Sequence, residues 1–321
     1  MKRIGLLLVV LIALLGGGAF VLSGALGQAT IEEETPFLIP AGSSLTAVAG
    51  KLEAEGLISS ADGFLLRARL FSSSEPIQAG EFKLVPGMDQ DAILRAFQSG
   101  DVIRRFVTIP EGMPSVLVHE RLMATPLLTG EIDVPPEGSI LPNTYAYERG
   151  ASRASLVEQM QKAMDRALAE EWAKRGPNTA VDTVRDALIL ASIVEKETGK
   201  PEERRMVAGL YSNRVRTGML LQADPTIIYP ITKGKPLGRR IRQSEIASVN
   251  GYNTYTRTGL PVGPITNPGR ESLAAVLNPA QTSALFMVAD GTGGHKFADT
   301  NAEHNANVEE WYRLRRDRGE M

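Results

Sequence analysis

An apolar helix that ends in two carboxylates is the feature that most constrains this chain. Residues 188–194 are apolar apart from Ser192. Glu195 and Glu197 follow directly, and Gly199 then ends the helical pattern. Such a run predicts a buried helix whose last turn carries a carboxyl group into apolar surroundings. Apolar surroundings raise the pKa of a carboxyl group and so keep its proton in place at neutral pH, as a general acid requires.

The two glutamates cannot serve one cleft while the helix stays regular. At about 100° per residue, Glu195 and Glu197 lie about 200° apart around the helix axis. A pair of catalytic carboxyl groups from this one helix is therefore excluded, and one glutamate faces the reaction. Apolar residues precede both, so periodicity leaves the choice open, and either could simply be a surface residue. The helix end beside Gly199, where a cleft can open, favours Glu197.

Composition excludes several classes of protein. The net charge is −2 and no long basic tract is present, so a nucleic-acid partner is not expected. The absence of cysteine excludes disulfides, thiolate catalysis and Cys-based zinc sites. The three histidines, His119, His295 and His304, do not have the two-histidine spacing of a zinc hydrolase. We therefore expect neither a metal nor a cofactor.

The sequence of the N-terminal segment predicts a membrane anchor. Residues 4–22 carry no charge, Lys2 and Arg3 precede them, and the first acidic residue is Glu32. This pattern predicts a single span within residues 1–30, with a cytoplasmic N-terminus and the body of the protein outside the inner membrane. A cleaved signal peptide ending near residues 25–27 is the alternative. The length of the apolar run favours the retained anchor.

The rest of the chain predicts an α+β protein. Residues 37–42, 82–87 and 106–112 are extended runs that each end in a Pro-x-Gly or similar turn, and a helical pattern follows each. Longer helices are predicted at residues 152–175, 183–198, 202–216 and 303–318, a short helix at 271–277 and a strand at 286–289. We predict a small LysM-like α+β module at 35–105, a connecting α+β segment at 106–150 and a mainly helical catalytic domain with short strands at 151–321. A plain α+β module without glycan binding is the alternative for 35–105.

Three segments together resemble one family. Residues 190–229, which include Leu221-Gln222-Ala223-Asp224-Pro225, look like the signature of the YceG-like family of endolytic murein transglycosylases. Residues 252–265 and 288–297 also fit, and the likeness extends over nearly the whole chain. One departure is Asn143, which stands where an aspartate is expected in that family.

The resemblance implies a lytic transglycosylase. Such an enzyme cuts the β-1,4 bond between N-acetylmuramic acid and N-acetylglucosamine without water and leaves a 1,6-anhydro end. One glutamate acts as acid and then as base, and Glu197 matches best because Thr198 stands where related enzymes commonly have serine. Candidate substrate-binding residues are Gln222, Asp224, Tyr229, Asn253 and Tyr255. Turn capping by Gln222 and Asp224, and a core position for Tyr255, are the alternatives.

The implied partners are nascent peptidoglycan strands, peptidoglycan synthases (penicillin-binding proteins) and elongation or division proteins. A membrane-anchored scaffold that binds peptidoglycan without cutting it is the alternative function, although a scaffold does not need the glutamate helix. A pyridoxal-phosphate lyase acting on aminodeoxychorismate is disfavoured, because that substrate is cytoplasmic and the sequence shows no Schiff-base lysine motif.

Overall fold

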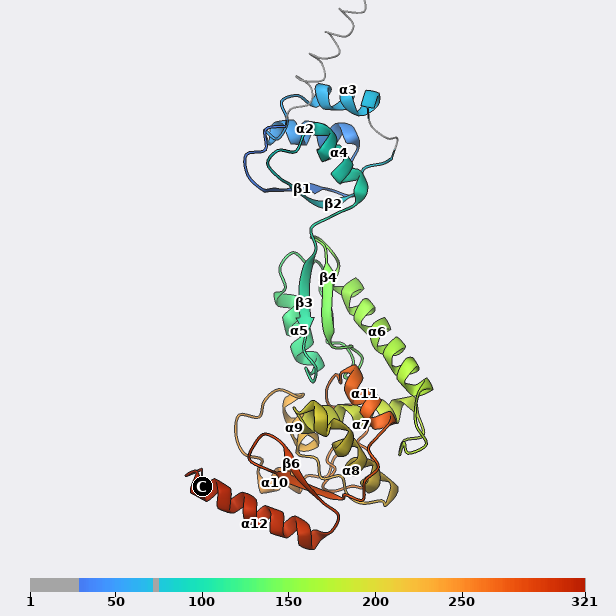
Figure 1. Cartoon of the computed structure of the whole chain (residues 1–321), viewed down its shortest axis with the longest axis vertical. Helices are drawn as coiled ribbons and strands as arrows, with labels where there is room; N and C mark the ends of the chain where they lie inside the picture. The colour runs from blue at the N-terminus through green and yellow to red at the C-terminus, as the bar shows by residue number, and fades with distance from the viewer. Residues whose placement is uncertain (1–28, 72–74, 321) are drawn as a thin grey trace, which may run out of the picture. The chain divides into compact units, whose positions relative to one another are not determined.

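The chain forms two compact units, and the division falls between Arg105 and Phe106 (Figure 1). The computed structural model describes residues 29–71 and 75–320. The predicted anchor at residues 1–30 lies outside the described residues except for its last two. In the described ranges, no helix combines the length and apolar character needed to cross a membrane.

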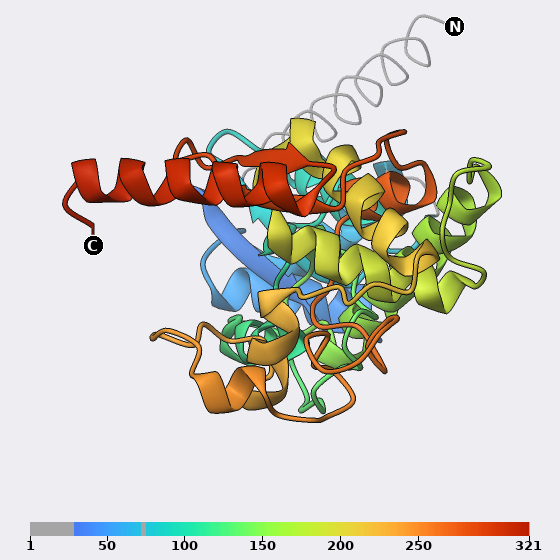
Figure 2. The ribbon, with the colours of Figure 1, turned by 90° about the horizontal axis from the view of Figure 1, so that it is seen from below.

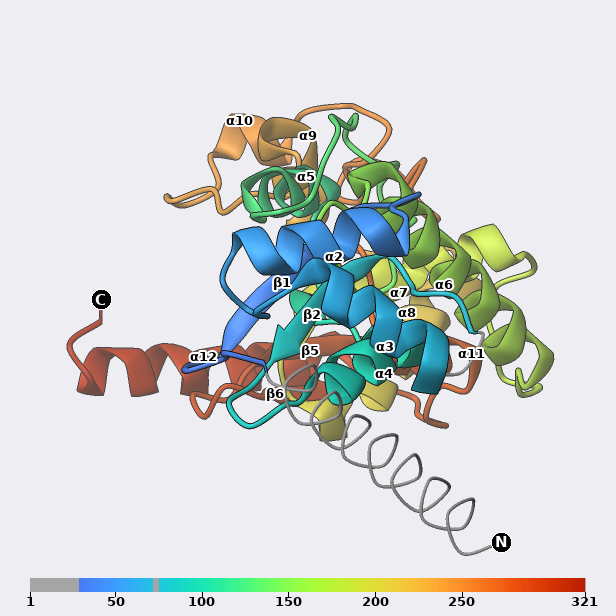
Figure 3. The same cartoon turned by 90° about the horizontal axis from the view of Figure 1, so that it is seen from above.

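The first unit is a two-stranded sheet covered on one face by helices (Figures 1 and 3). Strands β1 and β2 are antiparallel, with Phe37 opposite Phe82. The elements are β1 (Thr35–Ile39), α2 (Leu45–Ala54), α3 (Ala61–Phe71), β2 (Gly80–Leu84) and α4 (Gln90–Ser99). The structure adds α3, which the sequence pattern did not predict. The LysM-like character of this unit and the predicted division near residue 150 stay predictions.

Three aromatic rings form the centre of the first unit. The ring of Phe97 on α4 lies 5.5 Å from Phe37 and 5.0 Å from Phe82, and all three side chains are fully buried. Ser44 and Asp89 cap the N-termini of α2 and α4 through backbone N–H groups at 3.2 and 2.7 Å. The unit therefore has a hydrophobic core of its own.

The second unit begins with a second pair of strands. These strands pair with each other, and the elements are β3 (Arg105–Ile109), α5 (Ser115–Ala124), β4 (Asn143–Tyr147) and the long helix α6 (Arg153–Ala173). Met160 on α6 packs in the apolar cluster under β3 and β4. Met164, one turn later, belongs to the main cluster of the unit. Helix α6 thus connects the two clusters.

Helix α7 lies at the centre of the second unit, and helices α6, α8, α9 and α11 pack against it. Its residues from Ile189 to Val194 are fully or almost fully buried. The elements of this part are α7 (Val184–Glu197), the 3₁₀ turn η1 (Pro201–Glu203), α8 (Arg204–Arg216), α9 (Asp224–Thr232), α10 (Gln243–Ile246) and α11 (Arg270–Leu277).

A hairpin and a long charged helix complete the chain. Strands β5 (Phe286–Ala289) and β6 (His295–Ala298) are antiparallel, with Ala289 opposite His295. Helix α12 (Asn301–Asp317) runs along this hairpin, as Figure 2 shows in red. Thr300 and Glu303 close its N-terminus with a reciprocal capping box.

The predicted α+β class with short strands is confirmed. The sequence pattern predicted no helix between residues 217 and 270, yet α9 forms there. Pro225 lies in the first turn of α9, where a backbone N–H has no partner in the helix, so proline is tolerated there. Helix α9 brings Asp224 to the site described next.

Candidate active site

Helix α7 carries Glu197 as its last residue. The Thr183 hydroxyl accepts a hydrogen bond from the Asp186 N–H at 3.0 Å and so caps the start of the helix. At the other end, Thr198 adopts an extended conformation and leaves the helix. Neighbouring helices pack against α7 on several sides, and Glu197 in its last turn is partly buried.

The two glutamates of α7 have different partners. The Glu195 carboxylate accepts a hydrogen bond of 2.8 Å from the backbone N–H of Gly269, which is the N-cap residue of α11. Glu195 therefore stabilises the start of that helix. Glu197 instead interacts electrostatically with Tyr211 and Asp224. The two side chains diverge, as their angular separation on α7 predicts.

The Glu197 carboxyl group lies in surroundings that favour its protonated form. Its Oε1 atom is shielded from solvent and has no hydrogen-bond partner among the described residues. Burial raises the pKa of Glu197 to about 7, and the charge of Asp224 acts in the same direction. The Tyr211 hydroxyl and the Arg214 guanidinium oppose this rise in pKa. A carboxyl group balanced in this way can both give and take a proton near neutral pH.

Helix α8 supplies Tyr211 and Arg214 from one face. Tyr211 is almost completely buried, and burial raises the pKa of its phenol well above the usual value. Arg214 donates hydrogen bonds to the carbonyl oxygens of Leu221 at 2.6 Å and Leu285 at 2.7 Å. Arg214 is thus a fixed positive charge beside the Glu197 carboxyl group.

Sequence analysis did not single out Tyr211. Tyr211 lies three residues before Arg214, which places both on the same face of the predicted helix at 202–216. This spacing is the sequence signal that could have pointed to Tyr211. Asn213 points elsewhere, because its amide donates hydrogen bonds to the carbonyl oxygens of Thr282 and Ala284 at 2.8 and 3.0 Å.

Asp224 and Tyr255 form a hydrogen-bonded pair next to Glu197. The Tyr255 hydroxyl donates to Asp224 Oδ1 at 2.5 Å. Burial and the neighbouring carboxylates raise the pKa of Tyr255, so its hydroxyl keeps its proton. The first turn of α9 meets the loop that carries Tyr255, where Thr226 and Thr254 share a buried hydrogen bond of 2.8 Å between their hydroxyls. The structure therefore brings the predicted residues Asp224 and Tyr255 together with Glu197.

Gln222 lies just before this pair in an unusual backbone conformation. Its φ angle is +51°, in the left-handed region that non-glycine residues rarely adopt. The Gln222 N–H donates to the carbonyl of Thr254 at 3.1 Å, and the side chain is exposed. Strained backbone of this kind often accompanies functional sites. Contact between Gln222 and a substrate stays a prediction.

Tyr229 and Asn253 have internal partners. Tyr229 packs against Tyr252 with ring centres 4.8 Å apart, and its hydroxyl hydrogen-bonds to Glu137. Asn253 is fully buried, and its amide nitrogen donates to the carbonyl oxygens of Ile246 and Ser248 at 2.9 and 2.7 Å. Its amide oxygen accepts from the N–H of Tyr255, which makes Asn253 a support for that loop. Substrate contacts of Tyr229 and Asn253 stay predictions.

A groove of about 510 Å³ lies beside these elements. Lys196 and Pro225 contribute to its wall, whereas their sequence neighbours Glu197 and Asp224 do not line it. Most of its other lining is apolar and comes from the loop between β3 and α5, from α9 and from the segment after α9. A mostly apolar groove with few polar groups is typical of a site that binds an organic substrate. The described residues contain no group of His, Asp and Glu side chains placed to hold a metal ion.

Comparison with known proteins decides the family. A sequence model of the YceG-like family matches residues 37–310. This chain belongs to the YceG-like family. An endolytic murein transglycosylase of Bacillus subtilis (strain 168) is 28% identical over 331 residues, which cover 92% of this chain and 90% of that protein. An endolytic murein transglycosylase of Streptococcus pneumoniae serotype 2 (strain D39) is 26% identical over 85% of this chain but only 57% of its own length.

A solved structure supports the fold. The crystal structure of a yceG-like protein from Listeria monocytogenes matches with a TM-score of 0.54 and 27% sequence identity, over 86% of this chain and 99% of that chain. The YceG-like fold is therefore shared beyond the sequence motifs. The family match runs through α7, α8, α9 and the hairpin, the elements that carry the site.

Proposed function

We propose that this protein is an endolytic murein transglycosylase with Glu197 as its single acid and base. The observation that carries the proposal is the Glu197 carboxyl group, whose Oε1 is buried without a partner and whose pKa is raised to about 7. A shielded carboxyl oxygen without a hydrogen-bond partner is costly for stability, and groups with strongly perturbed pKa values concentrate at catalytic sites. The names of the Bacillus and Streptococcus relatives support murein as the substrate.

The reaction follows from a carboxyl group that can change its protonation state. Protonated Glu197 gives its proton to the oxygen that links N-acetylmuramic acid to N-acetylglucosamine, and the bond from that oxygen to the anomeric carbon breaks. The C6 hydroxyl of the same N-acetylmuramic acid attacks the anomeric carbon. The Glu197 carboxylate accepts the hydroxyl proton, and a 1,6-anhydro ring results without the addition of water.

The neighbours of Glu197 favour different protonation states of its carboxyl group. Burial and Asp224 favour the protonated acid that starts the reaction, while Tyr211 and Arg214 stabilise the carboxylate that follows. The hydroxyl of Tyr255 and the Asp224 carboxylate orient sugar hydroxyl or acetamido groups beside the reacting bond. Gln222 extends from the strained turn to the same sugars, and Asn253 holds the loop that presents Tyr255.

The proposed location rests on the charge and hydropathy pattern of residues 1–30, and the proposed partners rest on the family resemblance. A span within residues 1–30 would hold the protein in the inner membrane with its body outside, where nascent glycan strands are made. Cutting such strands would end their elongation, next to peptidoglycan synthases and other elongation or division proteins. The unit up to Arg105 would act as a LysM-like module that holds the strand.

Product analysis in isotopic water tests the reaction class. Full-length protein in detergent is incubated with uncrosslinked murein strands in H₂¹⁸O, and the fragments are analysed by mass spectrometry. The proposal predicts internal cuts with 1,6-anhydro ends and no ¹⁸O. Reducing ends that carry ¹⁸O would show a hydrolase instead. Binding to the strands without any fragment would favour the non-catalytic scaffold.

A further inference from the structure

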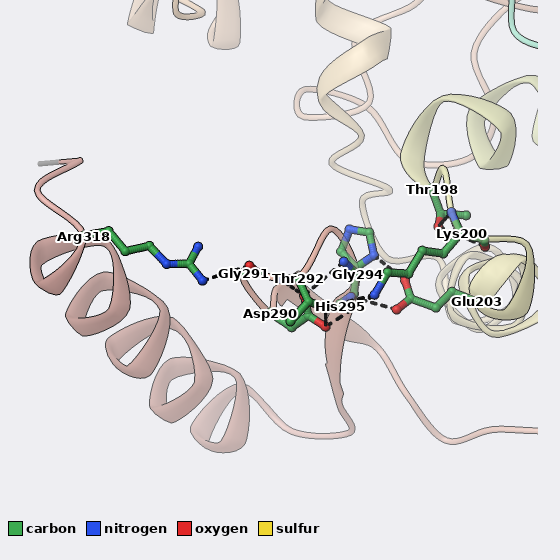
Figure 4. A network of polar contacts seen from close by, with 9 residues as sticks. All are labelled: Thr198, Lys200, Glu203, Asp290, Gly291, Thr292, Gly294, His295 and Arg318. Carbon is green, nitrogen blue, oxygen red and sulfur yellow. Dashed lines mark hydrogen bonds and ion pairs between the residues drawn. The ribbon is translucent and has the colours of Figure 1, made fainter.

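The turn of the β5–β6 hairpin contacts the chain segment that follows Glu197 (Figure 4). The Lys200 ammonium group donates to the Thr292 hydroxyl at 2.9 Å and lies 4.0 Å from an Asp290 carboxylate oxygen. Lys200 comes three residues after Glu197, and its own N–H donates to the Thr198 hydroxyl at 3.1 Å. The chain that leaves α7 is therefore held by the hairpin.

A second contact joins Glu203 to His295. One Glu203 carboxylate oxygen accepts from the His295 backbone N–H at 3.0 Å, and the other lies 2.8 Å from His295 Nδ1. Both side chains are largely shielded, with 15% and 17% of their surface exposed. A two-point contact with this degree of burial restrains geometry better than an exposed ion pair does.

Gly294 makes this close approach possible. A Cβ atom added at Gly294 would lie 2.2 Å from Glu203 Oε1 and 2.6 Å from Lys200 Nζ. The turn itself is closed by Asp290, whose Oδ1 accepts from the N–H groups of Thr292 at 2.7 Å and Gly294 at 3.0 Å. We call the set of Lys200, Glu203, Asp290, Thr292, Gly294 and His295 the hairpin clamp.

The start of the same hairpin contacts the other side of the site. Arg214 donates to the carbonyl of Leu285 at 2.7 Å, and its guanidinium carbon lies 5.6 Å from the centre of the Phe286 ring. The hairpin is therefore bound both to the segment after Glu197 and to a charged neighbour of Glu197. The hairpin thus contacts both the segment that leaves α7 and the helix α8 that carries Arg214.

We propose that Glu203 and His295 are positioning residues for the reaction at Glu197. The proposal rests on the proposed function. Glu197 is the last residue of α7, and helix ends fray unless the chain beyond them is fixed. By holding residues 198–203 against the hairpin, the clamp keeps the Glu197 carboxyl group beside Tyr211 and Arg214. In this role Glu203 and His295 act through the position of Glu197 and not through contact with the substrate.

Kinetics of clamp variants test this role. In full-length protein, Glu203→Gln and Gly294→Ala are expected to lower kcat by about 10- to 100-fold with little change in KM, because a small displacement of a catalytic group is costly. His295→Asn, whose amide can replace the ring Nδ1 donor, is expected to keep more activity than His295→Ala. The control is Glu310→Gln. This substitution removes an exposed ion pair of 2.6 Å to Lys296, which follows His295 on β6.

A spectroscopic measurement separates this proposal from the proposed function. The titration of Glu197 is followed by infrared spectroscopy, with its carboxyl band identified by its loss in Glu197→Gln. Glu203→Gln is expected to move this titration, and Glu310→Gln is not. Active wild type together with clamp variants that lose only melting temperature, with kcat and titration unchanged, would overturn the positioning role. Inactive wild type would overturn the proposed function. The titration would still decide whether the clamp sets the protonation of the Glu197 carboxyl group.

Discussion

At the scale of single residues, the pKa of Glu197 is set by influences that act in opposite directions. Burial and Asp224 raise its pKa, whereas Tyr211 and Arg214 lower it. Sequence reasoning could find Glu197 because the apolar run before it is visible along the chain. It could not find Tyr211, which looks like an ordinary core residue until the fold places its hydroxyl near a carboxyl group 14 positions earlier in the sequence.

Replacing these neighbours should move the pH profile in opposite directions. The acid must be protonated, so kcat/KM falls as the pH rises through the pKa of Glu197. Tyr211→Phe removes a group that lowers this pKa and should move the fall to higher pH. Asp224→Asn removes a negative charge that raises the pKa and should move the fall to lower pH. Rate measurements across the pH range would contradict the account if both variants moved the fall the same way.

The same carboxyl group should make stability depend on pH. The pKa of Glu197 is about 7 in the folded protein against an ordinary value of 4.5, so the folded state binds the proton more tightly than the unfolded chain. This contribution is complete below pH 4.5 and is lost as the pH rises through 7.

Glu197→Gln cannot ionise and should escape that loss. Its unfolding free energy should therefore exceed that of wild type by about 2 kcal/mol above neutral pH, and by much less in mild acid. Urea denaturation at both pH values measures the difference. An equal effect of the substitution at the two pH values would show that the Glu197 carboxyl group does not titrate as described.

At the scale of elements, most helices could be predicted from periodicity. Helices α6, α7 and α8 begin and end within a few residues of the predicted positions, because their apolar spacing and end signals are local. Helix α9 was missed because its two prolines suggested a loop, although one lies in the first turn, where proline is tolerated. Asn253 was predicted to meet substrate, and only the folded loop shows that its amide is occupied by backbone groups.

The N-terminal cap of α7 should contribute measurably to stability. Thr183→Ala removes the hydroxyl that accepts from the Asp186 N–H and should cost about 1 kcal/mol. Ser152→Ala is the matched control, because Ser152 occupies the same position of α6 without a side-chain cap hydrogen bond. Chemical denaturation of both variants tests this. Equal losses would mean that the Thr183 hydrogen bond contributes nothing particular to α7.

At the scale of the whole molecule, the chain consists of two units that each have a hydrophobic core. Phe97 packs only in the core of the first unit, whereas the site lies in the second. The sequence could predict that residues 35–105 contain helices and strands. It could not show which apolar faces meet, because each helix has more than one partner that its pattern would allow.

Damage to the core of one unit should stay in that unit. Phe97→Ala should destabilise the first unit by about 3–5 kcal/mol through loss of buried surface and a cavity. Hydrogen exchange should then rise across the described residues up to Arg105 and stay unchanged in α7 and α8. Phe106→Ala is the control, because that side chain is 66% exposed. Increased exchange in α7 would contradict the independence of the two cores.

The most direct test of the central claim compares the two glutamates of α7. Wild type, Glu197→Gln and Glu195→Gln are each incubated with murein strands, and the rate of anhydro-ended fragment formation is followed by mass spectrometry. Glu197→Gln should lower the rate by about 10²- to 10⁴-fold, since a general acid and base is lost. Glu195→Gln should remain active, because the Glu195 carboxylate accepts from the Gly269 N–H at the start of α11. Normal activity of Glu197→Gln beside an inactive Glu195→Gln would contradict the account.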